Sequence, residues 1–331
     1  MDKMSPSSQT RVSPQRILAT LQAYRVAAVV NTAIELELFT RIAHGNDTVN
    51  KLAGELDVPV RGIRLVCDLL ADAGLIIKDG EGLQLAPDAA MFLDKRSPAY
   101  LGESTGKLYT APLLHGFEQL TEFVRGRKSE EATTILPDWY DIGRGLTDQD
   151  EAVTAFVDAV LFPGGPFKIL DVGAGNGAYG IALAARYPEA IIVAADRPAE
   201  LKIAQDNAVR ARLRTRFQNI PGDFLAMPFG MDYDAAILAG HLNQLEPAQI
   251  ELLMKRIRDA LKKTGRLTIL EFLSPDDPEY AGFSLTMLTA TRRGGAYSVA
   301  EVQDLLRSSG FGAIESRPLP PAHATLITAQ P

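Results

Sequence analysis

The sequence predicts an α/β protein in which a doubly wound, mostly parallel sheet follows a mainly helical winged-helix domain. From residue 167 onward, short apolar runs typical of strands alternate with helix-like runs. This alternation is typical of an open parallel sheet with helices on both faces. Before residue 100, a helix, a turn, a second helix and a two-strand hairpin follow one another, which is the order of a winged helix.

The N-terminal region is predicted to begin with a long apolar helix. Residues 1–12, rich in Ser and Pro, are expected to form a flexible tail. Ser13 followed by Pro14 is a good helix start, since Ser caps and Pro suits the first turn. The apolar residues from Ile17 to Ile42 occupy more than one face. More than one neighbour must therefore cover this helix, and a partner subunit is one candidate.

The winged-helix elements follow from local signals. Thr48 is expected to cap a short helix, and residues 60–73 form a second one that Gly74 ends. An Asp79-Gly80 turn predicts a hairpin. The obvious role of such a unit is DNA binding, but its charge opposes this. Between residues 46 and 88, four basic side chains stand against eight acidic ones, a net charge of −4, which is the wrong sign for binding phosphate.

Bulk properties narrow the class further. The 331-residue chain is 46% hydrophobic and carries a net charge of −7, which disfavours a nucleic-acid partner. Its one cysteine, Cys67, fits a reducing compartment. No run reaches the roughly 18 apolar residues of a membrane span, and no signal pattern precedes the first helix. A cytoplasmic protein without a membrane partner is expected.

Four segments are predicted along the chain: the tail at 1–12, a winged-helix dimerisation domain at 13–100, a helical linker and pocket region at 101–161, and a catalytic domain at 162–331. Strands are expected at 167–172, 190–195, 215–220, 233–239, 266–272 and 324–329. Helices are expected at 177–186, 198–211, 247–262 and 298–309. The last part departs from simple alternation and is a candidate for an antiparallel edge strand.

The segment from Lys168 to Ala178 predicts a nucleotide-type cofactor site. An apolar strand leads into glycines at every second position, Gly173, Gly175 and Gly177, and a helix-like run follows. The next apolar run ends on Asp196. Gly173-x-Gly175-x-x-Ala178 formally matches the dinucleotide fingerprint, with Asp196 about 20 residues later. A nicotinamide cofactor is therefore one alternative.

Other residues around the loop favour S-adenosylmethionine. Asp171 directly precedes the loop, where a carboxylate can contact a cationic amino-acid group but would repel a pyrophosphate. Asp223 and Phe224 follow the third strand, where they can accept from an adenine amine and pack on its ring. Asp196 can accept from both ribose hydroxyls with either cofactor. Plain structural roles for Asp171, Asp196 and Asp223, as caps or turn residues, remain alternatives.

Motifs spread over nearly the whole chain resemble one family. The chain resembles S-adenosylmethionine-dependent O-methyltransferases with an N-terminal winged-helix dimerisation domain, the plant caffeate and acetylserotonin type and bacterial relatives. The matching motifs are Glu35 to Phe39, Leu69 to Leu75, Ser97 to Gly102, Leu170 to Gly177, Gly222 to Phe224, Ser284 to Thr291, Gly294 to Ser298 and Ser309 to Phe311.

The resemblance implies a class I methyltransferase fold, a homodimer through the N-terminal domain and a small-molecule substrate. It implies His241 as general base and Glu271 as the acid that orients it. The implied cofactor contacts are Asp171, Gly173, Gly175, Gly177, Asp196, Arg197, Gly222, Asp223 and Phe224. The resemblance implies Met287, Thr291 and Tyr297 as substrate-pocket residues, with a helix packed on the sheet edge as the alternative. Among the aromatic residues of the linker region, most of which are expected to be core, Tyr109 and Trp139 are further pocket candidates.

Two positions depart from the plant pattern. Where plant members have His-Asp-Trp, this chain has His241-Leu242-Asn243, and a second flanking acid is replaced by Ala296. His241 is therefore either the base or a residue that only shapes the pocket. No cluster has metal-ligand spacing, so no metal is expected.

The sequence thus predicts a methyltransferase that acts on a hydroxyl of an aromatic or polyketide-like metabolite. A carbon or nitrogen acceptor, or a relative that binds the cofactor without methylating, is the nearest alternative. A nicotinamide-dependent oxidoreductase and a ligand-sensing transcription regulator are further ones. The alternating arginines from Arg210 to Arg216 are either an anion grip or a solvated helix end.

Overall fold

A computed structural model describes residues 13–102, 111–126, 149–160, 168–271, 280–290, 295, 297–319 and 324–331. The chain divides into two compact units, Met1–Thr110 and Ala111–Pro331. Each unit is described by itself.

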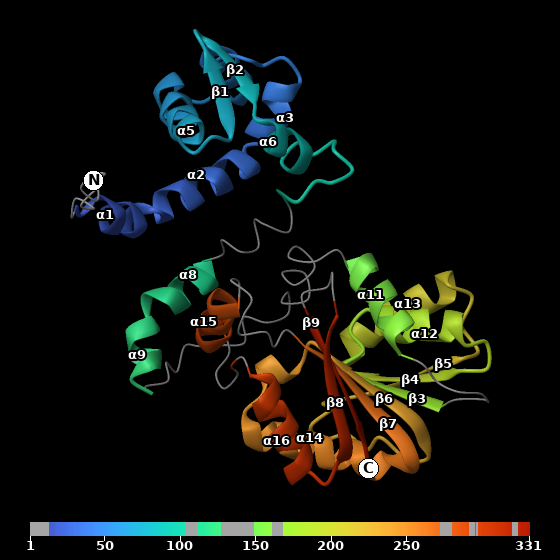
Figure 1. Cartoon of the computed structure of the whole chain (residues 1–331). Coiled ribbons are helices and arrows are strands. Elements are labelled where there is room, and N and C mark those ends of the chain that lie inside the picture. Colours follow the sequence, from blue (N-terminus) through green and yellow to red (C-terminus); the bar gives the residue numbers. More distant parts are fainter. Residues whose placement is uncertain are drawn as a thin grey trace, which may run out of the picture. The chain divides into compact units, whose positions relative to one another are not determined.

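The first unit consists of short helices and one hairpin (Figure 1). Its elements are α1 Gln15–Gln22, α2 Tyr24–Glu35, α3 Leu38–Ala43, α4 Val49–Leu56, α5 Val60–Asp72, β1 Ile76–Asp79, β2 Gly82–Leu85 and α6 Pro87–Phe92. Helix, turn, helix and hairpin follow in the predicted order. Phe39, Leu52 and Leu70 lie in its core with almost no exposed surface.

The helix cap and the turn glycines predicted from the sequence are found at the predicted positions. The Thr48 side chain accepts a hydrogen bond from the Lys51 N–H at 3.2 Å and so caps α4. Gly74 follows α5 with a φ of +77°, a left-handed conformation that glycine adopts without strain. Gly80 turns the β1–β2 hairpin with a φ of +61°.

The N-terminal apolar run is three helices rather than one long helix. Helices α1 and α2 are separated only by Ala23, which keeps helical dihedral angles, and the chain turns at Glu37, which has a φ of +53°. No residue of α1 is buried. Ile17 and Leu21 of α1 and Tyr24 at the start of α2 are each more than 60% exposed, so the first unit by itself leaves the apolar face of α1 uncovered.

By length and average composition, one stretch of the described residues would be long enough to cross a membrane. It is Gln15–Glu35, in which an 18-residue window has a mean hydropathy of 1.3 and is 6% buried. Arg16 and Arg25 interrupt it, and a single apolar stretch near the N-terminus is a weak sign of a span.

The second unit contains a seven-stranded sheet in the order β5-β4-β3-β6-β7-β9-β8 (Figure 1). Its strands are β3 Lys168–Val172, β4 Ile191–Asp196, β5 Phe217–Pro221, β6 Tyr233–Ala239, β7 Leu261–Glu271, β8 Gly312–Leu319 and β9 Ala324–Gln330. The first five in this order are parallel, whereas β9 is antiparallel to both of its neighbours. The doubly wound, mostly parallel sheet is confirmed.

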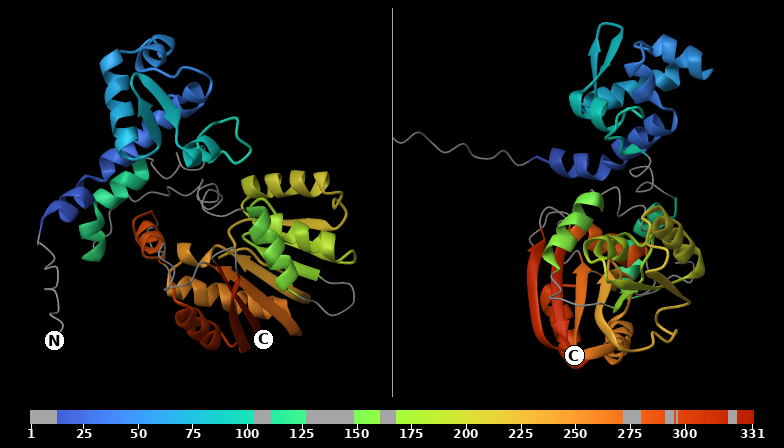
Figure 2. Two further views of the ribbon diagram at one scale, coloured as in Figure 1. Left: turned by 45° about the horizontal axis from the view of Figure 1, so that its top comes forward. Right: turned by 90° about the vertical axis from the view of Figure 1, so that its right-hand side faces the viewer.

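Helices cover both faces of the sheet (Figure 2). One face packs on α14 Pro247–Ala260 and α16 Val299–Ser308. The other packs on α11 Gln149–Ala159, α12 Ala178–Arg186 and α13 Pro198–Arg210. Outside these layers lie α8 Ala111–Glu118, α9 Leu120–Val124, α15 Tyr280–Ala290 and the 3-10 turn η2 Leu242–Gln244.

One C-terminal expectation needs correction. The sequence predicts a single antiparallel strand at the sheet edge, but β9 lies inside the sheet and β8, which was not predicted, forms the edge. Strand β8 is mostly exposed, so its sequence lacks the apolar alternation that marks a strand.

In the arginine run, Arg210, Arg212 and Arg214 are exposed. Arg216 instead donates to the carbonyls of Ala184, Tyr187 and Ala190, a structural role.

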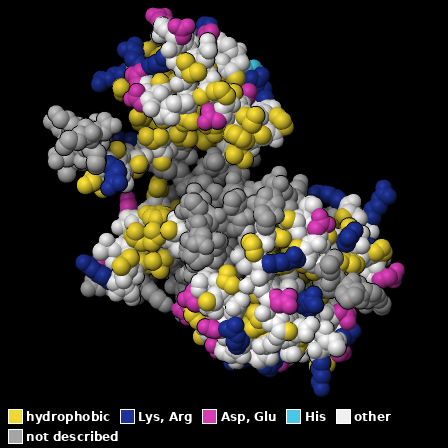
Figure 3. Space-filling model, in the orientation of Figure 1, with side chains coloured by type: hydrophobic (Ala, Val, Ile, Leu, Met, Phe, Trp, Pro, Cys, Tyr) yellow, Lys and Arg dark blue, Asp and Glu magenta, His cyan; other side chains and the backbone are white. Residues whose placement is uncertain are grey.

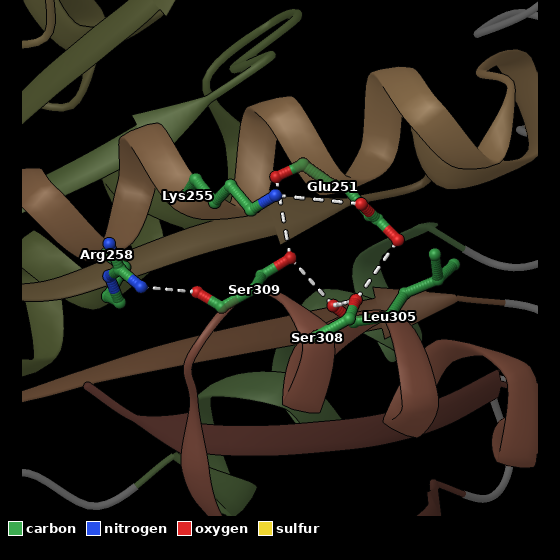
Figure 4. Close-up of polar contacts among 6 residues, drawn as sticks. All are labelled: Glu251, Lys255, Arg258, Leu305, Ser308 and Ser309. Atoms are coloured by element: carbon green, nitrogen blue, oxygen red, sulfur yellow. Dashed lines mark hydrogen bonds and ion pairs between the residues drawn. The ribbon is translucent and has the colours of Figure 1, made fainter.

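A polar clamp joins α14 to the end of α16 (Figure 4). The Arg258 guanidinium donates to the Ser309 carbonyl at 2.7 Å. The buried Ser309 hydroxyl donates to the Leu305 carbonyl at 2.7 Å and to the Glu251 carbonyl at 3.4 Å. Among the described residues, Lys255 forms a surface ion pair with Glu251, at 3.7 Å.

The clamp predicts unequal effects for two cations on the same helix. Arg258→Ala removes a charge-assisted hydrogen bond to a carbonyl at the helix end, and we expect a loss of about 1 kcal/mol in unfolding free energy. Lys255→Ala, the matched control, removes an exposed pair and should change stability by well under about 1 kcal/mol. Urea denaturation measures both. Equal effects of the two substitutions would contradict the clamp.

Candidate active site

Four predicted polar residues meet at the carboxyl edge of the sheet. Asp171 lies near the end of β3 and Asp196 ends β4, while His241 follows β6 and Glu271 ends β7. These strands are adjacent and parallel. Residues that lie up to 100 positions apart in the chain therefore gather at the edge where open α/β sheets bind ligands.

The glycine loop after β3 is tied to the end of β4. Gly173, Gly175 and Gly177 all have positive φ angles, of +66°, +54° and +79°. The Gly173 N–H donates to the Ala195 carbonyl and the Gly175 N–H donates to the Asp196 carboxylate, both at 2.8 Å. Only glycine adopts such a succession of conformations without strain.

Asp196 has a structural function in addition to its expected one. One carboxylate oxygen accepts from Gly175 and the other accepts from the Arg197 N–H at 2.7 Å. The side chain is 3% exposed. A carboxylate has about four lone-pair positions, so these two bonds leave acceptor capacity for ligand hydroxyls.

Asp171 is a buried acid under the loop. It is 3% exposed, and its Oδ2 atom accepts no hydrogen bond of normal geometry. That oxygen lies against Gly180 in the first turn of α12, where an added Cβ would be 2.6 Å away. Burial and the charge of Asp196 raise the pKa of Asp171 from 3.8 to about 7, against the opposing effect of the Gly180 N–H. The site therefore carries negative charge that a cationic ligand would neutralise.

His241 lies directly on the glycine loop. Its Nε2 atom is 2.7 Å from the Gly173 carbonyl oxygen, and the side chain is 3% exposed. Phe224 meets the imidazole edge to face, with the ring centres 5.5 Å apart. Burial lowers the pKa of His241, although the Asp196 charge and the Gly173 carbonyl act in the opposite direction. The imidazole is therefore neutral at pH 7.

Glu271 holds the turn that carries His241. It is 2% exposed. Its Oε1 atom accepts from the Leu242 N–H at 2.6 Å, and its Oε2 atom accepts from the Asn243 side-chain amide at 3.4 Å. The Asn243 Oδ1 atom is buried without a hydrogen-bond partner. These contacts fix the backbone next to the imidazole.

The segment after β5 brings the remaining predicted cofactor residues to this edge. The Gly222 N–H donates to the Asp196 carbonyl at 2.9 Å. Asp223 is exposed, and its carboxylate accepts from the Leu225 N–H at 2.8 Å. Phe224 is half-buried beside His241. The predicted contacts from three strands thus lie around one loop.

The predicted substrate-pocket residues are only partly described. Met287 on α15 is fully buried, and Tyr297 is 9% exposed. The Tyr297 hydroxyl donates to the Leu245 carbonyl, so it serves the protein's own packing. Tyr109, Trp139 and Thr291, and also Ala296, lie outside the described residues.

Sequence reasoning missed Tyr179 in the first turn of α12. Burial raises its pKa to about 12, and the negative charges of Asp171 and Glu271 add to the shift. Its ring packs edge to face on Phe156, with centres 5.0 Å apart. Its position two residues after the last loop glycine was the available signal. In the part of the chain that the structure describes, no three His, Cys, Asp or Glu side chains are placed to hold a metal.

Comparison with known proteins identifies the family. The model of the O-methyltransferase domain matches residues 144–312. The chain belongs to this O-methyltransferase family. Its methyl donor is S-adenosylmethionine, as the resemblance implied.

Individual relatives cover nearly the whole chain. A 3-hydroxy-5-methyl-1-naphthoate 3-O-methyltransferase of Streptomyces sahachiroi is 27% identical, over 87% of this chain and 86% of the relative. The tetracenomycin polyketide synthesis 8-O-methyl transferase of Streptomyces glaucescens is 26% identical, over 93% and 94%. The crystal structure of a putative O-methyltransferase from Nostoc punctiforme superposes with a TM-score of 0.86 at 30% identity, over 97% and 100%.

The residues of this O-methyltransferase fit the donor. S-adenosylmethionine carries a sulfonium and an ammonium group, and the edge offers the unpartnered Asp171 oxygen near the Asp196 charge. A pyrophosphate would add negative charge to two buried carboxylates, which is unfavourable. The three glycine positions of the loop have no side chains of their own that would keep a ligand from the backbone.

The buried acid predicts a pH-dependent stability. Because folding raises the pKa of Asp171 from 3.8 to about 7, the folded state binds this proton more tightly than the unfolded state. Stability from this group is present below pH 3.8 and is lost as the pH rises to about 7. Asp171→Asn should therefore raise the melting temperature of the ligand-free protein at pH 8, and the gain should shrink toward pH 5.

Thermal unfolding between pH 5 and 8 measures this difference. Asp206→Asn, an exposed acid on α13, is the control and should follow the wild type at every pH. A stability difference for Asp171→Asn that does not vary with pH would refute the assignment.

Proposed function

We propose that the protein transfers the methyl group of S-adenosylmethionine to a hydroxyl of an aromatic or polyketide-like small molecule, with His241 as the general base. The observation that carries the proposal is the placement of a neutral, buried imidazole against the glycine loop at the ligand-binding edge of the sheet. The naphthoate and polyketide substrates in the names of the curated relatives support the acceptor class.

The cofactor is assigned to the residues around the loop. Gly173, Gly175 and Gly177 let its amino-acid part approach the backbone, and the Asp171 charge lies beneath. Asp196 accepts from the ribose hydroxyls, and its position is held by the N–H groups of Arg197 and Gly222, which donate to it. Asp223 accepts from the adenine amine and Phe224 packs on the ring. When bound, the donor supplies a methyl group activated by a sulfonium.

The chain's contribution is alignment and proton removal. A phenol with a pKa near 10 is a weak nucleophile at neutral pH until its proton is taken. The lowered pKa of His241 keeps the imidazole neutral and able to accept that proton. The Asp196 charge and the Gly173 carbonyl then stabilise the imidazolium. In-line alignment of acceptor and methyl carbon lowers the barrier by several kcal/mol.

The alternatives fit the structure less well. A nicotinamide dinucleotide would place its pyrophosphate over the Asp171 and Asp196 carboxylates. A DNA-binding regulator would need a basic surface, but acidic and basic side chains are interspersed on the face seen in Figure 3. The acidic winged-helix region, with its net charge of −4, also opposes DNA binding.

Ligand-induced stabilisation tests the cofactor. S-adenosylhomocysteine should raise the melting temperature of the purified chain, because a ligand that binds the folded state stabilises it. NADH at the same concentration should not. Stabilisation by NADH alone would overturn the proposal. Incubation of the enzyme with donor and a panel of phenols, naphthols and their amino analogues, read by mass spectrometry, then separates oxygen from carbon or nitrogen acceptors.

The base assignment predicts a selective loss of turnover. We expect His241→Ala to reduce methyl transfer about 10²- to 10⁴-fold, the usual contribution of a general base, while S-adenosylhomocysteine still binds. Isothermal titration calorimetry and a radiolabelled methyl assay measure the two effects. His44→Ala, an exposed histidine of the first unit, is the control. Undiminished turnover of His241→Ala would show that His241 is not the base.

We propose a homodimer through the N-terminal domain, predicted at residues 13–100. The uncovered apolar face of α1, with Leu21 at 69% exposure and Ile17 at 62%, supports it, because contiguous exposed apolar surface marks interfaces. Leu21→Glu should convert a dimer to a monomer in size-exclusion chromatography with light scattering. A wild-type monomer would refute the proposal. The predicted domain boundaries and the cytoplasmic location stay predictions.

A further inference from the structure

We propose that the backbone carbonyl of Gly173 holds His241 as the Nε2–H tautomer, so that Nδ1 is the atom that takes the acceptor's proton. The glycine loop would then position both the methyl donor and the base. This inference rests on the proposed function, since it specifies the atom through which His241 acts.

The tautomer follows from the chemistry of the partner. The Nε2 atom lies 2.7 Å from the Gly173 oxygen, within hydrogen-bond distance. A carbonyl oxygen can only accept, so the hydrogen of this bond belongs to Nε2. A neutral imidazole has one N–H and one lone pair, and burial keeps His241 neutral. The lone pair is therefore on Nδ1.

The carbonyl that sets the tautomer is itself rigidly placed. The Gly173 N–H is bonded to the Ala195 carbonyl at 2.8 Å, and the residue has a φ of +66°. A Cβ added at Gly173 would lie 2.1 Å from the imidazole Nε2 and 2.4 Å from Cδ2. The ring thus occupies the space where a side chain would be. The centre of the Phe224 ring lies 5.5 Å from the centre of the His241 ring, and this contact limits rotation of the imidazole.

Glu271 and Gly173 divide the positioning of the base. The Glu271 carboxylate accepts from the Leu242 N–H at 2.6 Å, one residue after His241, and so holds the backbone. The Gly173 carbonyl holds the ring. An acceptor placed on one nitrogen of a histidine determines the nitrogen that remains basic, and here that acceptor is in the cofactor loop.

The proton transfer is balanced with these groups alone. The acceptor's O–H bond breaks, its proton bonds to Nδ1 through the imidazole lone pair, and the electron pair left on oxygen becomes the nucleophile. His241 then has a hydrogen on each nitrogen and a positive charge. Its Nε2–H bond to Gly173 becomes charge-assisted, and such bonds are roughly twice as strong as neutral ones. The loop therefore stabilises the product of proton transfer.

Nitrogen chemical shifts test the tautomer directly. The chain has four histidines, so two-bond proton–nitrogen correlations of the full-length, ¹⁵N-labelled protein at pH 8 resolve each ring. The signals lost in His241→Gln identify this residue. We expect a protonated Nε2 and an unprotonated Nδ1, with and without S-adenosylhomocysteine. A protonated Nδ1 with an unprotonated Nε2 in both states would overturn the inference.

Two amide variants test the positioning role independently of turnover. The Gln amide can place its nitrogen near Nε2, whereas the Asn amide reaches only the position of Nδ1. His241→Gln should keep the bond to Gly173, and with it the melting temperature and S-adenosylhomocysteine affinity of the wild type. His241→Asn should lose both in part, and neither variant should turn over. The opposite ranking of affinity and stability would overturn the inference. Wild-type turnover in both variants would instead refute the base.

Discussion

The site depends on one set of backbone hydrogen bonds, those that close the glycine loop of β3 onto its neighbours. Gly173 and Gly175 donate to the end of β4, and the Gly173 carbonyl meets His241 after β6. Each bond requires a positive φ angle that other residues adopt only with strain. With this loop in place, the carboxylates, the imidazole and the start of α12 have defined positions. Without these bonds, the side chains at the strand ends would not be held relative to one another.

Burial explains the electrostatics of this edge. Asp171, Asp196, His241 and Glu271 are each 3% exposed or less, which is unusual for ionisable side chains. Asp196 and Glu271 are bonded to backbone N–H groups, whereas Asp171 keeps an unpartnered oxygen and a raised pKa. In the ligand-free protein, ionisation of the buried Asp171 is therefore unfavourable, at the place where a cationic donor is expected. Functional sites often carry such a cost in stability.

Local sequence signals determine the elements that lie within a single segment. The Thr48 cap, the turn at Gly80 and the parallel strands from Lys168 to Leu270 follow from spacing and composition. The predictions are wrong for elements whose formation depends on neighbouring parts of the fold. Strand β8 is mostly exposed, and its pairing with β9 places it in the sheet. The N-terminal run turns at Glu37, where no proline or glycine marks the turn.

By itself, the sequence determined the α/β class, the family and the residues that gather at the cofactor edge, because these depend on periodicity, glycine spacing and short motifs. Only the tertiary structure decided how those residues act on one another. In the folded chain, the His241 ring contacts a carbonyl of the glycine loop, and the Glu271 carboxylate accepts from the Leu242 N–H. The fold also places Tyr179 near Asp171 and Glu271. The His241–Gly173 bond joins residues 68 positions apart and the Leu242–Glu271 bond joins residues 29 apart. Strand pairing and burial set these distances, and no local pattern encodes them.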